Sequence, residues 1–200
     1  DAEQRVGSPA LQVGYELGFG KVNIVALPVF RPSVIPLGDT GGLSVREMRP
    51  DDTKRDFALK FERQEPELEW SVSWLHGHSL RPNITPAANI ATSATLELRY
   101  PKVDVIGADF AVPWRAIILR GESAYTHASN CCDLAGVEFR KRNNLFTVLG
   151  AESAIGDGWR VVTQVFHKQN FGKASNNSAA PPMLVALARA SDIANEELRS

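Results

Sequence analysis

LQVGYELGF, residues 11–19, places an apolar side chain at every odd position. The even positions hold Gln12, Gly14, Glu16 and Gly18. Because side chains of a β-strand alternate between the two faces of a sheet, this period of two predicts a strand with one apolar face. A turn at Gly20-Lys21 and a second apolar strand over Val22–Phe30 complete an expected hairpin.

The same alternation returns in three further pairs of segments, each joined by a short turn. These turns are expected at Gln64–Glu67, at Val112–Arg115 and at Gly156–Gly158, where an Asp-Gly pair supplies the positive φ of a tight turn. The eight expected strands cover about residues 10–19, 21–30, 55–63, 68–75, 102–111, 116–126, 145–155 and 159–168.

Long connections alternate with these short turns. Arg31–Lys54, Leu75–Ala94 and His127–Asn144 are expected as loops, and Thr95–Tyr100 as a short strand. Outer-membrane barrels separate short turns from long loops in this way, since the strands run up and down across the bilayer. Met183, Leu187, Ala190 and Ala194 recur at helical spacing, which predicts a short amphipathic helix over residues 183–198.

Composition excludes two classes of protein. The 200 residues carry 22 Lys plus Arg against 23 Asp plus Glu, a net charge of −1, which gives no electrostatic reason to expect nucleic acid. The longest apolar run, Ile24–Phe30, is far below the ~20 residues of a membrane-spanning helix. The chain opens at Asp1 without a targeting signal and stops at Ser200 in a segment that looks helical. We therefore expect residues 1–200 to be a single domain and a fragment of a larger barrel.

The two faces of the expected sheet differ in composition. The apolar face collects aromatic side chains near strand ends, as the aromatic girdles of a membrane barrel do: Tyr15, Phe19, Phe57, Phe61, Trp70, Trp74, Tyr125 and Trp159. The opposite face supplies the candidate lumen-lining residues Glu16, Lys60, Glu62, Glu69, Asp109, Arg120, Glu122, Glu152, Arg160 and Gln164. A soluble half-buried sheet has the same period with its polar face toward water, so a β-sandwich or a lipocalin-like ligand-binding barrel is the alternative.

Several short motifs resemble a large uncharacterised family of Gram-negative outer-membrane β-barrels. They are Tyr100–Phe110 with Pro113 and Leu119–Tyr125, Val148–Glu152 with Gly156–Trp159 and Gln164, and the less specific Leu27–Pro32. The resemblance covers residues 5–168 and departs from the family at Val162, where a polar lumen residue is expected, and at Cys131-Cys132.

This resemblance implies a location in the outer membrane, contact with its lipid and an antiparallel up-and-down transmembrane barrel. It also implies a role in moving small, hydrophobic or lipid-like solutes, with a periplasmic protein as a further partner. It implies no catalytic residues and no cofactor.

Four charged residues on neighbouring hairpins suggest an ion-pair ladder: Arg120, Glu122, Glu152 and Arg160. Such a ladder either narrows a pore and sets which solutes pass, or holds a barrel rigid because unpaired buried charges are costly. The polar face mixes both signs of charge, which argues against strong ion selectivity.

The remaining candidate groups give weaker indications of a disulfide, a metal site or an active site. Cys131 and Cys132 are adjacent and could form a disulfide in an oxidising compartment, but with His127 they match no zinc spacing. His76-Gly77-His78 is expected as a solvated feature at the start of a loop. The nucleophile elbow, the phosphate-binding loop and the zinc-protease motif are missing from the sequence, so we expect no enzyme, no metal and no cofactor.

The expected function is a passive channel or transporter of the outer membrane. The three long loops would gate it or contact ligands outside. A structural barrel that anchors a periplasmic or surface partner is a third hypothesis.

Overall fold

A computed structural model describes residues 7–33, 44–51, 56–86, 95–129, 133–134, 137–138, 143–155 and 158–171. The described residues form strands and connections, with no helix among them, and so no helix that could cross a membrane. The helix expected over residues 183–198 and the pair Cys131-Cys132 lie outside the described residues.

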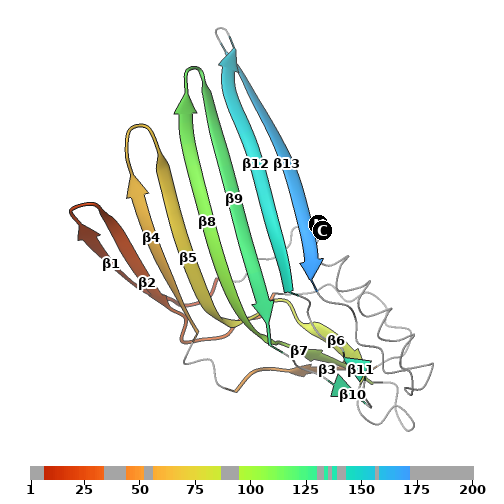
Figure 1. Ribbon diagram of the computed structural model, residues 1–200. Coiled ribbons are helices and arrows are strands. Elements are labelled where there is room, and N and C mark those ends of the chain that lie inside the picture. Colours follow the sequence, from red (N-terminus) through yellow and green to blue (C-terminus); the bar gives the residue numbers. More distant parts are fainter. Residues whose placement is uncertain are drawn as a thin grey trace.

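Eight long strands form one large antiparallel sheet (Figure 1). They occur where the alternation of the sequence predicts them, and neighbours in the chain are neighbours in the sheet. In sheet order they are β1 (Leu11–Leu17), β2 (Gly20–Ala26), β4 (Phe57–Gln64), β5 (Glu69–His78), β8 (Lys102–Trp114), β9 (Ile117–Ala128), β12 (Asn143–Ile155) and β13 (Trp159–Phe171).

Two of the expected turns are displaced along the chain. The first hairpin turns at Gly18-Phe19, because Glu16 pairs with Lys21 and Leu17 with Gly20. The third turns at Arg115-Ala116, where Arg115 has a φ of 57°, so Pro113 belongs to β8. The expectation of turns at Gly20-Lys21 and Val112–Arg115 was wrong by two or three residues.

The sequence predicted that the three long connections are simple loops, and this prediction was wrong. Two of them supply β3 (Ser44–Met48), β6 (Asn83–Pro86) and β7 (Thr95–Arg99), which form a separate sheet in the order β3-β7-β6 that we call the cap sheet. The third contains the short pair β10 (Asp133–Leu134) and β11 (Val137–Glu138). β7 is the short strand expected at Thr95–Tyr100, but its parallel pairing with β3 departs from an antiparallel up-and-down order.

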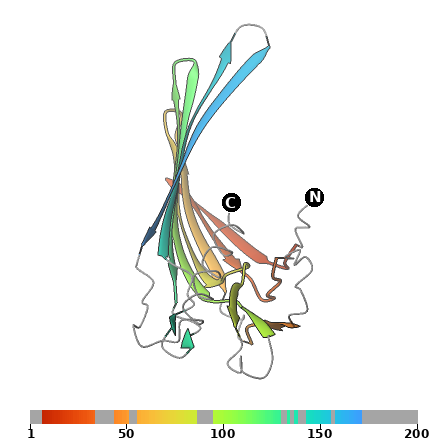
Figure 2. The same cartoon turned by 90° about the vertical axis from the view of Figure 1, so that its right-hand side faces the viewer.

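The large sheet is open, since β1 and β13 pair on one side only. What the structure supports is therefore an eight-stranded antiparallel sheet, not a closed barrel. Figure 2 shows this sheet as a curved, twisted wall, with the cap sheet beyond the end opposite the short turns.

The buried apolar side chains gather in the cap sheet and at the end of the large sheet nearest to it, which we call the base. The buried apolar side chains of the described chain are Leu98, Tyr100, Val103 and Ala128. No core lies on the apolar face of the large sheet, where side chains from β1 to β13 are exposed. The fold thus has one sheltered end and one broad, uncovered apolar surface.

Candidate lumen face

The strand register places all ten candidate lumen residues on one face of the large sheet, which we call the polar face. Directly paired residues of adjacent strands share a face. Glu62 pairs with Ser71, Ser71 with Asp109 and Asp109 with Glu122, so these side chains follow one another across four strands. The other candidates have the same parity in their own strands: Glu16, Lys60, Glu69, Arg120, Glu152, Arg160 and Gln164.

A network of polar contacts lies on the polar face at β1, β2 and β4. Asn23 accepts a hydrogen bond from Gln12 at 3.3 Å and donates one to Glu62 at 3.2 Å. Lys60 lies 3.3 Å from the same Glu62 carboxylate, and Lys21 lies 3.5 Å from Glu16. Polar partners from the two flanking strands, β1 and β4, therefore satisfy the buried amide of Asn23.

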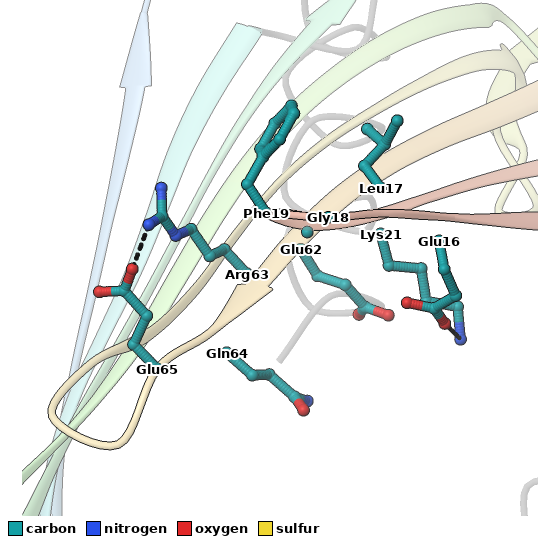
Figure 3. A pocket seen from close by; sticks show the side chains of 10 residues that line it. Glu16, Leu17, Gly18, Phe19, Lys21, Glu62, Arg63, Gln64 and Glu65 are labelled. Atoms are coloured by element: carbon teal, nitrogen blue, oxygen red, sulfur yellow. Dashed lines mark ion pairs between the residues drawn. The ribbon is translucent and has the colours of Figure 1, made fainter.

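The separation of the two faces is visible at the turn end of these strands. Figure 3 shows the side chains of Leu17 and Phe19 on one side of the strands, with Glu16, Lys21 and Glu62 on the other. These residues line a pocket, which is also bordered by an ion pair between Arg63 and Glu65. The alternation of apolar and polar residues in the sequence thus places the two kinds of side chain on opposite faces of the sheet.

The expected ladder forms only in part. Arg160 Nη2 lies 2.6 Å from Glu152 Oε1. Within the described chain neither Arg120 nor Glu122 has an ion-pair partner within 4.0 Å. Register explains this: Arg120 faces Gly150 and Glu122 faces Val148, so no opposite charge lies directly across the strand pair.

A hollow on the polar face gathers six of the ten candidates. Its lining includes Glu69, Asp109, Arg120, Glu122, Glu152 and Gln164. Asp109 accepts a hydrogen bond from Ser71, which is buried. Val162, the expected departure from a polar lining, does face this side, where it pairs with Glu152.

The opposite face, which we call the apolar face, carries exposed apolar side chains on each of the eight strands. Leu11 is 66% exposed, Ile106 60% and Trp159 78%. The aromatic residues expected on this face are there, with Tyr15, Phe57, Phe61, Trp70, Trp74, Tyr125 and Trp159 in its register rows. Phe19, in the first turn, contacts Phe61 with the two rings tilted and their centroids 6.1 Å apart.

A row of polar residues ends the apolar face at the base. His76 Nδ1 lies 2.8 Å from Asp104 Oδ1, and Trp74 Nε1 donates to the same oxygen at 3.3 Å. Asp104 pairs with His127 on the next strand. From Ile106 to Trp114, β8 therefore presents an uncharged band about 27 Å long at ~3.4 Å per residue, with the polar row just below it.

The motif His76-Gly77-His78 is not a solvated loop feature, because it forms the end of β5. Each histidine has an aspartate partner: Asp104 for His76, and Asp56 for His78 at 2.9 Å. The side chains of His78 and Asp56 are only 5% and 8% exposed. Sequence reasoning missed Asp56, since an aspartate inside a charged, proline-bounded stretch carries no local sign of a distant partner.

The described residues hold no group of three or more side chains that could bind a metal ion. Comparisons of the chain with protein-family models, curated proteins and solved structures found no match.

Proposed function

We propose that this chain forms part of an outer-membrane β-barrel that acts as a passive channel or transporter. The observation that carries the proposal is the distribution of exposure over the large sheet. Apolar and aromatic side chains are bare on one face, while the sheltered core lies at the base.

In water this arrangement is unfavourable. Apolar surface in contact with water costs roughly 25 cal/mol per Å², and large uncovered patches mark surfaces that meet something apolar. A soluble sandwich or lipocalin-like barrel would bury Trp74 and Ile106 and expose Asn23 and Ser71. Here Trp74 and Ile106 are exposed, while Asn23 and Ser71 are buried.

The dimensions suit a bilayer. Outer-membrane strands of ~9–11 residues carry an apolar band ≈ 25 Å tall with aromatic residues at both borders. β5 and β8 have 10 and 13 residues. Trp74 and Tyr125 lie next to the polar row at the base, and Trp114 and Trp159 lie at the turn end.

The polar face would line a water-filled interior. Positively charged lysine and arginine lie there beside negatively charged carboxylates, glutamine and serine. In a bilayer these groups stay hydrated only when they face a water-filled interior. Because both signs are present, solutes would pass by diffusion with weak selectivity for charge.

A lipid-embedded sheet has no hydrogen-bond partners at its edges, so β1 and β13 must be paired. We propose that further strands pair with both and close the barrel. β13 has the character of a paired strand, with no proline and with Val, Thr, Phe and Trp prominent in its 13 residues.

The chain with its closing strands should need detergent for extraction and should migrate differently in a gel before and after heating. Single-channel recording in a planar bilayer should then show discrete current steps. Recovery of the protein as a free monomer without detergent would contradict a membrane location. Insertion without current would favour a structural anchor.

A further inference from the structure

Four side chains connect the cap sheet to the large sheet, and we call them the clasp: Phe30, Asp56, His78 and Tyr100. They come from both long connections that build the cap sheet and from the last residue of β5. Two main-chain hydrogen bonds reinforce the junction, from Ser33 N–H to Leu80 O at 3.1 Å and from Ser79 N–H to Pro101 O at 2.9 Å.

Asp56 and His78 form the fixed half of the clasp. The Asp56 carboxylate accepts a hydrogen bond from His78 N–H at 3.1 Å, and its other oxygen lies 2.9 Å from His78 Nδ1. The main-chain oxygen of Asp56 accepts from Leu27 N–H at 2.9 Å. Since both side chains are buried and satisfied, this half anchors the start of β4 to the end of β5.

Phe30 joins this anchor to the cap sheet. Its ring meets the His78 ring edge-on at 6.1 Å and the Tyr100 ring at 4.9 Å. Tyr100 follows β7 directly and donates its hydroxyl hydrogen to Glu47 of β3 at 2.8 Å. Contacts therefore run without a break from the large sheet through Phe30 to two strands of the cap sheet.

The junction borders the polar face at the base. A Cβ on Gly77 would lie 3.0 Å from Asp56 Cγ, so the Asp56 side chain sits on the side of β5 to which Gly77 points. Gly77, Val103 and Ala128 form the polar-face row at the base, and Val103 is 4% exposed. On the apolar face at this end, His76 and Asp104 are more accessible, at 35% and 41%.

We propose that the cap sheet is a gate at the base of the polar face and that the clasp, through its residue Phe30, holds this gate closed. This inference rests on the proposed function, because a gate needs an interior to close. Phe30 lies outside every strand and is only half-buried, so its loss should release the cap sheet while the large sheet stays intact.

The test measures access to the sheltered row with a membrane-impermeant maleimide. The protein, purified with its closing strands in detergent or vesicles, carries Val103→Cys in a background of Cys131→Ser and Cys132→Ser. In this background labelling should be slow. Phe30→Ala should speed it about tenfold, as expected for an opening equilibrium that loses two ring contacts.

Phe19→Ala is the matched control, because it removes a ring contact at the opposite end of the sheet and should leave the labelling rate unchanged. Phe30→Tyr keeps the ring and should label slowly. Equal rates in Phe30→Ala and Phe19→Ala would overturn the gate. Labelling also works in a protein that passes no current, so failure of the gate and failure of the channel are distinguishable.

Discussion

Along β8 and β9 the two faces of the large sheet can be compared at neighbouring positions. Ile106 pairs with Tyr125 on the apolar face, and both are exposed. One residue further, Gly107 pairs with Ala124 on the polar face, and both are partly covered. These two larger apolar side chains thus lie where nothing of the described protein covers them, as the proposed contact with lipid requires.

The largest expected effect comes from placing a charge on the apolar face. Leu149→Arg should lower the free energy of unfolding in lipid vesicles by about 2–4 kcal/mol, the cost of a lipid-facing arginine near the bilayer midplane. Leu149 is exposed and lies in the register row of Phe110, at the middle of the apolar band. Urea titration followed by tryptophan fluorescence measures this. Gln164→Arg adds the same group to the polar face and should change stability by less than about 0.5 kcal/mol. Equal losses in both variants would remove the distinction between the faces.

A second comparison uses one glycine on each face. A methyl group at Gly121 would overlap the Phe110 ring on the apolar face, whereas at Gly150 it would lie 3.3 Å from the flexible Gln164 side chain. Gly121→Ala should cost about 1–3 kcal/mol through overpacking, and Gly150→Ala clearly less. The same titration should resolve the two, and the reverse order would show that Phe110 does not pack over Gly121.

The cap sheet should lose stability in acid through one carboxyl group, that of Glu47. Burial raises the pKa of Glu47, but hydrogen bonds from Arg49 and Tyr100 outweigh it, and the net pKa is lowered. A carboxyl whose pKa is lower in the folded state stabilises that state above its ordinary pKa, and this stabilisation is lost as the pH falls through the lowered value.

As the pH falls below about 4.3, the ordinary pKa of a glutamate, hydrogen exchange in β3 and β7 should therefore accelerate relative to the intrinsic exchange rate. In Glu47→Gln this additional acceleration should be missing, while β9 serves as the internal reference. Identical acceleration in the variant would exclude Glu47 as the source.

The smallest effect is expected at the ion pair of Arg160 with Glu152. The arginine side chain is 69% exposed, and exposed pairs contribute little because water and salt screen them. Arg160→Gln should shift the urea midpoint less than Gly121→Ala does. A shift of similar size would mean that the ladder holds the sheet together after all.

The large sheet could be predicted from sequence because its information is local. Alternation in LQVGYELGF sets both the strand and its faces, and the short connections leave few ways to pair. The turn at Gly18-Phe19 was predicted two residues too late, because Gly20 is an equally suitable turn residue. Only the pairing of Glu16 with Lys21 distinguishes the two.

The cap sheet could not be predicted in the same way. β3 pairs in parallel with β7, which lies about 50 residues further along the chain, so no short-range pattern reports the contact. The clasp could not be predicted for the same reason, since Phe30, Asp56 and Tyr100 come together only after the hairpins have brought their strand ends together. On the polar face, by contrast, parity along each strand was enough to group the ten candidates.

The central claim, that the apolar face meets lipid, can be tested without any substitution. All four tryptophans of the chain, Trp70, Trp74, Trp114 and Trp159, lie on that face. In vesicles of lipids brominated along the acyl chain, their fluorescence should fall strongly while aqueous iodide has little effect. Strong quenching by iodide with none by the brominated chains would show that this face is in water, and would contradict the account.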